Sequence, residues 1–321
     1  MIIGHQKQCN FLKKIFESNQ LAHAYLFSGA EQLGKKVLAK EFVKLINCVS
    51  DQSNKKPCGV CKNCKDIEKE SYLDLLFVKP ADDKKEIEVS QIREVLNFLS
   101  YKSYYGSFKA VIIDKAETMN SEAQSCLLKT LEEPKGKTIL ILISEHPEML
   151  FGTILSRCQA IKFYCVNQKE IENHLVKIGA KEKIAKYLSS FCQGRPGRAI
   201  NLFLNPEELE KEQKSLEELV KVVNSGLAEK FQYAKKINTE KNNLNQIFQI
   251  LQRYLRHLLF IKTGAEALAH QDYFPEASGN LKNYSVSKIK DVLKLLETIN
   301  MQTSLTNANP KLAFEILLME M

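Results

Sequence analysis

The sequence predicts an α/β fold in which helices cover a parallel sheet, followed by an all-helical region. Three observations predict it. Short apolar runs alternate with helical patterns over the first half of the 321-residue chain, as in βαβ units. A glycine-containing turn of the phosphate-loop type follows the first apolar run. Beyond about residue 165 the apolar runs disappear and amphipathic helical patterns replace them.

Five apolar runs are the candidate strands of the sheet. They are residues 25–27, 75–78, 110–113, 139–143 and 161–163. Between the third and fourth runs we expect a helix that Asn120 or Ser121 caps and Pro134 ends. The later helices are expected at residues 216–223, 244–262, 286–299 and 311–319.

These patterns predict three domains. Residues 1–165 would form a nucleotide-binding α/β domain with a cysteine-containing insert at 48–64. Residues 166–208 would form a small helical lid, and residues 209–321 a larger helical domain. Asn205-Pro206 marks a break within the helical half.

Composition excludes several classes of protein. With 44% hydrophobic and 26% charged residues, the chain is neither disordered nor collagen-like. Its longest apolar run, residues 139–143, is far shorter than the roughly 20 residues that a membrane span needs. The first residues lack the features of a signal peptide, so we expect a cytoplasmic protein without membrane contact.

The net charge of +8 is spread thinly along the chain. Residues 1–165 carry 24 Lys and Arg against 20 Asp and Glu, residues 166–210 carry 7 against 6, and residues 211–321 carry 15 against 12. A protein that grips DNA by itself concentrates positive charge on one element. This even distribution argues against one possible function, that of a zinc-ribbon protein that binds DNA directly.

Four of the nine cysteines lie close together in the chain. Cys48, Cys58, Cys61 and Cys64 form a C-x9-C-x2-C-x2-C pattern in a polar, lysine-rich segment. Four thiolates complete the tetrahedron that structural zinc prefers, and no His or carboxylate at matching spacing suggests a catalytic metal. We therefore predict a structural Zn²⁺ site, against the alternative of scattered thiols.

The turn after the first strand has the phosphate-loop form G-x4-G-K. Gly29 and Gly34 bracket it, and Lys35 would reach the β- and γ-phosphate oxygens. The next position should be the Ser or Thr whose hydroxyl binds Mg²⁺, but it is Lys36. Glu31 adds a negative charge within the loop. We therefore expect a degenerate loop with no Mg²⁺ site, and passive nucleotide binding stays open.

The ends of the third and fourth strands carry the other candidate nucleotide-site residues. Asp114 has the position of a Mg²⁺-binding acid, but Lys115 follows it where a second acid would activate water. Glu117, two residues on, would need a shifted backbone to replace that acid. Ser144 either senses a γ-phosphate or bonds its own backbone.

Several motifs resemble those of one known family. LLKTLEEP at 127–134 and SRC at 156–158 are together similar to the clamp-loader branch of the AAA+ ATPases, most closely its delta-prime type. HAYLF at 23–27, GRPGRA at 194–199 and NPKLA at 309–313 extend the resemblance over the chain. It implies a lid and a collar domain, and membership of a hetero-pentameric ring with gamma/tau and delta subunits. Through that ring the chain would act on the sliding clamp and primer-template DNA.

The resemblance also implies residue roles. Arg157 of the SRC motif would enter the neighbouring subunit's ATP site as an arginine finger. Arg198 matches the residue that contacts nucleotide in active members. Because Lys36 and Lys115 replace the cation-handling residues, we expect a stator without ATPase activity of its own. The alternative is an ATP-hydrolysing motor subunit of the gamma/tau type, with Glu117 in the catalytic role.

Overall fold

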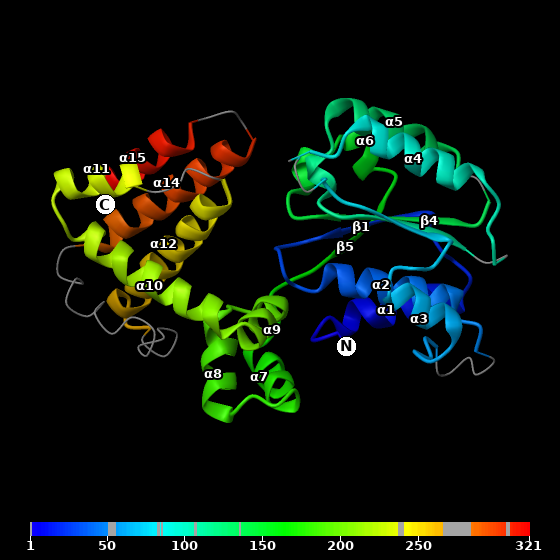
Figure 1. Cartoon of the computed structure of the whole chain (residues 1–321), viewed down its shortest axis with the longest axis horizontal. Helices are drawn as coiled ribbons and strands as arrows, with labels where there is room; N and C mark the ends of the chain where they lie inside the picture. The colour runs from blue at the N-terminus through cyan, green and yellow to red at the C-terminus, as the bar shows by residue number, and fades with distance from the viewer. Residues whose placement is uncertain are drawn as a thin grey trace. The chain divides into compact units, whose positions relative to one another are not determined.

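The computed structural model divides the chain into two compact units, Met1–Ile200 and Asn201–Met321 (Figure 1). Its described residues are 2–50, 56–81, 84, 86–105, 108–134, 136–236, 241–265, 284–305 and 309–321. The sheet and the helices nearest to it belong to the first unit, and the second unit is helical. The predicted boundaries at 165/166 and 208/209 stay predictions, because this division places the lid helices mostly with the sheet.

The first unit contains a five-stranded, wholly parallel sheet, as predicted. Its strands are β1 Ala24–Ser28, β2 Leu75–Val78, β3 Lys109–Ile113, β4 Thr138–Ser144 and β5 Gln159–Lys162. The spatial order is β2-β3-β4-β1-β5, so β1 lies between β4 and β5. A ligand site is expected at such a point, where consecutive connections leave in opposite directions.

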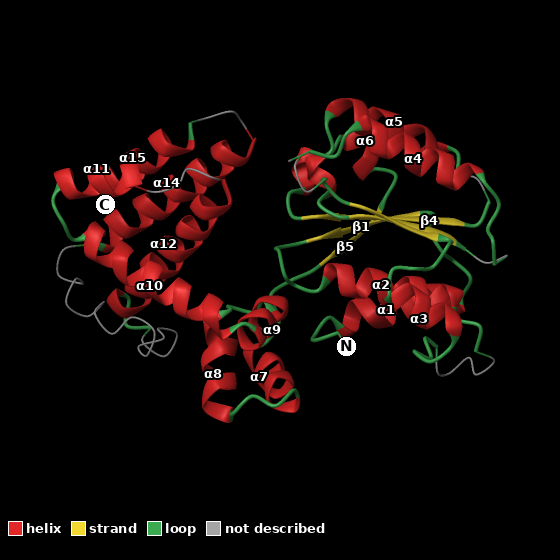
Figure 2. Cartoon of the chain, in the orientation of Figure 1, coloured by secondary structure: helices red, strands yellow, loops and turns green. Residues whose placement is uncertain are grey.

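Helices cover both faces of this sheet (Figure 2). On one face lie α1 Gln6–Glu17, α2 Lys35–Asn47 and α3 Lys62–Glu68; on the other lie α4 Val89–Ser100, α5 Ser121–Glu132 and α6 Gly152–Leu155. The 3-10 turns η2 Ala116–Thr118 and η3 Pro147–Met149 follow β3 and β4.

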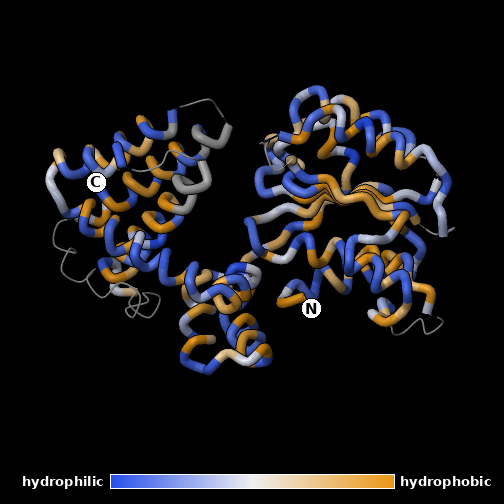
Figure 3. The backbone as a smooth tube through the Cα atoms, in the orientation of Figure 1, coloured by the Kyte–Doolittle hydropathy of each residue, from blue (hydrophilic) through white to orange (hydrophobic). Residues whose placement is uncertain are grey.

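Burial on both faces explains the continuous apolar runs of the sequence. Phe27 of β1 belongs to the same apolar core as Phe42 of α2, whereas the preceding residue, Leu26, belongs to the core on the other face, with Leu127 of α5. Figure 3 shows the strands as a hydrophobic band between the two helical layers. The sequence therefore reads as apolar runs rather than as alternation.

Helix α5 begins and ends where the sequence predicts. The Asn120 side chain accepts a hydrogen bond from the Ala123 amide at 2.8 Å, which caps the first turn. The helix ends at Glu132, two residues before Pro134. His23 Nε2 lies 2.9 Å from the Leu131 carbonyl oxygen, which ties this end of the helix to the start of β1.

Three further helices follow the sheet: α7 Gln168–Lys177, α8 Glu182–Phe191 and α9 Pro196–Leu204. They correspond to the predicted lid. The first turn of α9 reaches the phosphate loop, because the Gly197 amide donates to the Gln32 carbonyl oxygen at 2.9 Å. A Cβ at Gly197 would lie only 2.9 Å from that oxygen, so this close approach requires glycine.

The second unit is a helical bundle with its own apolar core. Its helices are α10 Pro206–Val223, α11 Leu227–Lys236, α12 Lys241–Lys262, α14 Val286–Leu305 and α15 Pro310–Glu320. Pro206 begins α10, as the predicted break requires. Leu255, Ile289 and Leu317 are among its fully buried residues. Within the described part of the chain, no helix combines the length and apolarity that a membrane crossing requires.

Candidate functional site

The carboxyl ends of β1, β3 and β4 bring the predicted nucleotide-site residues to one edge of the sheet. These strands are neighbours, so the loop after β1 lies beside Asp114 after β3 and Ser144 at the end of β4. The Gly29 amide donates to the Ser144 carbonyl oxygen at 3.2 Å. The predicted loop, acid and sensor position therefore form one site.

Backbone geometry in the phosphate loop requires its two glycines. Gly29 has φ of +144°, and a Cβ there would lie 2.5 Å from the Phe163 carbonyl oxygen. Gly34 has φ of +95° and forms the N-cap of α2. The loop therefore leads into a helix N-terminus, where free amides and the helix dipole favour an anion.

The Lys35 side chain folds back onto the phosphate loop. Its ammonium donates to the carbonyl oxygens of Gly29 and Ala30, the latter at 2.7 Å. The residue is only 6% exposed, and this burial lowers the pKa of Lys35 despite the acids nearby. Because an ammonium has three donors, one N–H stays available for an anion.

Lys36 is directed away from that anion position. Its ammonium lies 3.5 Å from Glu70 Oε1 and 5.2 Å from the centre of the Phe77 ring. Glu70 also pairs with Lys40 of α2 at 2.6 Å. Lys36, which stands where a complete phosphate loop has its Mg²⁺-binding residue, thus connects α2 to the residues just after α3 through an ion pair.

Lys115 interacts with the other unusual residue of the loop. Its ammonium lies 3.8 Å from Glu31 Oε1, and its backbone has φ of +54°. The Lys115 amide donates to Asp114 Oδ1 at 3.1 Å. Lys115 and Glu31, which both depart from the nucleotide-hydrolysing pattern, therefore lie close together with opposite charges.

Three polar residues lie beneath the loop. The Glu145 amide donates to Glu117 Oε1 at 3.2 Å. Neither Glu117 Oε2 nor the Ser144 hydroxyl, both buried, has a hydrogen-bond partner among the described residues. The alternative in which Ser144 bonds its own backbone is therefore not what the structure contains.

Glu145 belongs to this site, although sequence reasoning missed it. Burial, together with repulsion from Glu31, raises the pKa of Glu145 to about 7. Its position directly after the predicted sensor residue was the available signal, because side chains at the carboxyl end of a buried strand face the ligand site.

Arg198 lies in α9 and is 9% exposed. Its guanidinium carbon lies 5.4 Å from the centre of the Phe191 ring, within cation–π range. Whether Arg198 contacts a nucleotide stays a prediction.

Arg157 occupies the turn after α6 and is partly exposed. One guanidinium nitrogen donates to the Thr153 carbonyl oxygen at 3.0 Å and to the Ser156 hydroxyl at 3.4 Å. The other lies 2.8 Å from Glu132 Oε1, at the end of α5. The sequence motif LLKTLEEP contains Glu132 but does not predict this pair.

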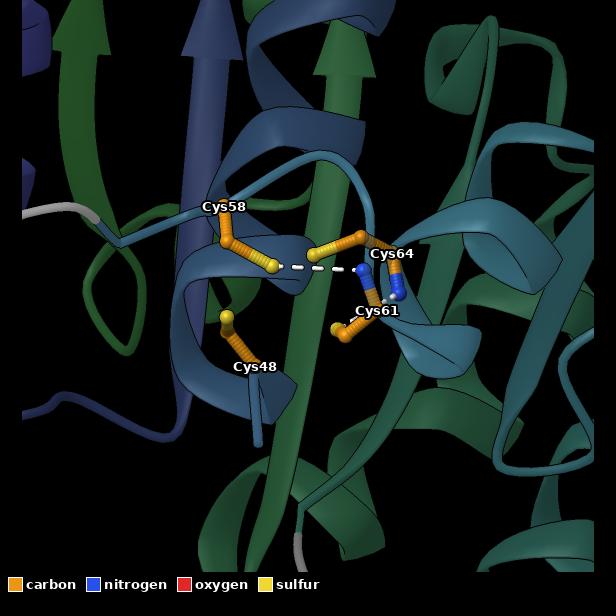
Figure 4. A group of neighbouring side chains, drawn as sticks. All are labelled: Cys48, Cys58, Cys61 and Cys64. Atoms are coloured by element: carbon orange, nitrogen blue, oxygen red, sulfur yellow. Dashed lines mark hydrogen bonds between the residues drawn. The ribbon is translucent and has the colours of Figure 1, made fainter. Parts of the chain in front are cut away.

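The four predicted cysteines come together at the far end of α2 (Figure 4). Their sulfur atoms all lie within 4.8 Å of one another. Cys48 follows the last residue of α2 and Cys61 caps α3, so two helix ends hold the group. All nine cysteines of the chain are free thiols. This arrangement could hold a metal ion.

Backbone amides prepare two of the sulfurs for a cation. The Cys61 amide donates to the Cys58 sulfur at 3.3 Å, and the Cys64 amide donates to the Cys61 sulfur at 3.4 Å. The Cys61 amide, with that of Val60, lowers the pKa of Cys58 to about 6. Burial raises the pKa of Cys64. A tetrahedral zinc ion matches such a four-sulfur group.

Comparison with known proteins agrees with these features. The family model described as "DNA polymerase III, delta subunit" matches residues 4–167. The chain is 31% identical to the Bacillus subtilis DNA polymerase III subunit delta′ over 287 residues, which are 88% of this chain and 85% of that protein. The chain belongs to the clamp-loader family of AAA+ proteins.

Two further comparisons cover different shares of the chain. The chain is 36% identical over 183 residues to the Haemophilus influenzae subunit tau/gamma, which covers 57% of this chain but only 26% of that protein. The crystal structure of a DNA polymerase III gamma subunit-related protein from Thermotoga maritima aligns with 97% of both chains at 20% identity and a TM-score of 0.48.

Proposed function

We propose that this clamp-loader protein is a delta-prime-type subunit that hydrolyses no ATP. It would complete a hetero-pentameric ring with gamma/tau and delta subunits and present Arg157 to a neighbouring ATP site. Through that ring it would assist ATP-driven loading of the sliding clamp onto primer-template DNA, in the cytoplasm. We assign a structural Zn²⁺ to the four-cysteine group.

The observation that carries this proposal is the direction of two lysines. Lys36 lies against Glu70 and Phe77, and Lys115 lies against Glu31. An ammonium at either position cannot coordinate Mg²⁺, which neutralises the charge that develops during phosphoryl transfer. Lys35 and the loop backbone still suit an anion, so the site favours at most a bound nucleotide that is not consumed.

Arg157 supports the second half of the proposal. An arginine finger must reach beyond its own subunit, and the Arg157 side chain is 35% exposed. Its contacts hold it at the surface without enclosing it. Such a finger in trans contributes roughly 10³–10⁵ in rate.

One observation favours the alternative, an ATP-hydrolysing motor subunit. Glu117 is buried near Lys35, and one of its carboxylate oxygens has no partner among the described residues. That carboxylate could orient a water molecule. The residue directly after Asp114 is Lys115, however, so the second acid of the hydrolysing pattern is absent there. The positive charge of Lys115 also disfavours a Mg²⁺ ion nearby.

ATP turnover by the isolated chain separates the two functions. We expect no turnover above background with Mg²⁺ and ATP, because the cation-handling side chains are absent. A coupled assay for ADP, together with the nucleotide content of the purified protein, provides the measurement. Turnover of about 1 s⁻¹ or more, within the ordinary range of enzymes, would contradict the stator.

Substitution of Arg157 tests the finger in the reconstituted complex. We expect Arg157→Ala to lower ATP turnover of the complex by at least about 10³-fold at the affected site. Because the other sites keep their own fingers, turnover should be resolved by site with single-turnover kinetics. Arg157→Lys keeps the charge but not the planar fork and should recover little.

The control for Arg157→Ala is assembly. Its elution with the partner subunits and its melting temperature should match those of the unaltered chain, because the side chain is partly exposed. Unchanged ATP turnover in a correctly assembled complex would remove the finger role.

A further inference from the structure

The exposed guanidinium of Arg157 is held from two directions. Thr153 and Ser156, which belong to its own turn, bind one terminal nitrogen. Glu132 binds the other from a different helix, at 2.8 Å. Local contacts alone would leave the plane of the guanidinium free to tilt, whereas a contact at each terminal nitrogen fixes it.

The position of Glu132 is electrostatically unusual. It is the last residue of α5, where unpaired carbonyl groups give the helix end a partial negative charge. An acid is disfavoured there unless a cation offsets it, and Arg157 is that cation. The neighbouring acid Glu133 is exposed and makes no ion pair with any described residue. Of these two adjacent acids, only Glu132 pairs with Arg157.

We propose that Glu132 is a positioning residue that orients the Arg157 guanidinium for the neighbouring ATP site. The inference rests on the finger role proposed above. A free arginine side chain samples many rotamers, and ordering it as the reaction proceeds would lower the rate. Glu132 holds it ordered beforehand.

The contacts leave capacity for a phosphoryl group. A guanidinium has five N–H donors, and Thr153, Ser156 and Glu132 engage three of them. Two donors have no bond with described residues and can meet phosphate oxygens. Glu132 therefore need not be displaced when the finger acts.

The test is ATP turnover by the reconstituted complex carrying Glu132→Gln. This variant removes the charge but keeps the shape. We expect kcat at the affected site to fall about tenfold with KM within about twofold, since misplacing a reacting group by about 1 Å can cost 10²-fold. Glu133→Gln is the matched control, with the same change one residue along, and should leave both values unchanged.

A double-mutant cycle separates positioning from a merely structural role. Adding Glu132→Gln to Arg157→Ala should lower kcat no further, because no guanidinium remains to be oriented. A structural role would instead give additive losses and a lower melting temperature in both backgrounds.

The outcomes distinguish this inference from the proposed function. If Arg157→Ala lowers kcat but Glu132→Gln leaves it unchanged, the positioning role is overturned and the finger stands. A rise in kcat with Glu132→Gln would also overturn it, because Glu132 would then restrain the finger. If Arg157→Ala itself has no effect, the proposed function fails as well.

Discussion

The two ends of helix α2 have kept different parts of their chemistry. Its C-terminal end leads into Cys48, where four sulfurs converge as a complete metal-binding set. Its N-terminal end follows Gly34, where the phosphate loop keeps its glycines and Lys35. There, however, Lys36 occupies the position that should bind a cation.

The difference shows that fold and reactivity depend on separable residues. The four cysteines join the end of α2 to the start of α3, so we expect the local structure to depend on them. The cation-binding residues of the loop contribute little to folding, and their replacements make ion pairs with Glu70 and Glu31. If the proposed function is correct, the loop keeps its shape without supporting hydrolysis.

The largest effect is expected at the C-terminal end of α2, where the four cysteines lie. Cys61→Ser should release about one zinc per chain and lower the melting temperature by about 10 °C. Structural zinc supplies roughly 10–16 kcal/mol of apparent binding energy in small zinc-binding peptides. Because the sheet and its helices add stability of their own, we expect a smaller loss here, about 3–5 kcal/mol; at about 2–4 °C per kcal/mol in a unit of this size, this corresponds to about 10 °C. Metal analysis and thermal unfolding provide the measurements.

Cys165→Ser is the control for that variant, because Cys165 is exposed and lies outside the four-cysteine group. It should leave metal content and melting temperature unchanged. A purified wild-type protein that contains no metal, even when it is prepared without chelators, would contradict the site.

An intermediate effect is expected for Glu145, which lies in the site near the phosphate loop. Because the pKa of Glu145 is raised to about 7, the folded protein binds a proton that the unfolded chain has released between pH 4.5 and 7. Glu145 therefore lowers stability as pH rises through this range. Glu145→Gln should add about 1–2 kcal/mol at pH 8, after a discount for partial solvation, and little at pH 4.5.

Thermal unfolding at several pH values measures the Glu145 effect. The difference in melting temperature between Glu145→Gln and wild type should grow from pH 5 to pH 8. Glu133→Gln, which alters an exposed acid that makes no ion pair with any described residue, should show no such trend. A constant difference would mean that Glu145 is ionised throughout.

The smallest expected effect concerns the ion pairs that Glu70 makes with Lys36 and Lys40 near the N-terminal end of α2. Glu70→Gln should lower stability by at most about 1 kcal/mol, as is usual for exposed pairs. Raising the salt concentration should shrink the difference from wild type. A loss of several kcal/mol would show that the pairs with Lys36 and Lys40 hold the loop in place.

Much of the fold could be predicted because it depends on patterns among residues that are close in the sequence. The strands were visible as apolar runs, and the α5 cap as an Asn before a helical pattern. The four cysteines were visible as close spacing. The order of the strands was not, because it depends on how distant segments pair.

The site was predicted less completely for the same physical reason. Residue types identified Lys36 and Lys115 as departures, but not their partners. Glu70 comes from beyond the cysteine insert, and Glu31 meets Lys115 only because β1 and β3 flank β4. The contact between Glu132 and Arg157 likewise joins residues that are 25 positions apart.

The hydrogen bond from Gly197 to Gln32 joins the lid helix to the loop through main-chain atoms alone. Because both partners are backbone groups, the bond does not depend on the side chain of Gln32. A side chain at position 197 would force the helix and the loop apart, since its Cβ would lie 2.9 Å from the Gln32 carbonyl oxygen.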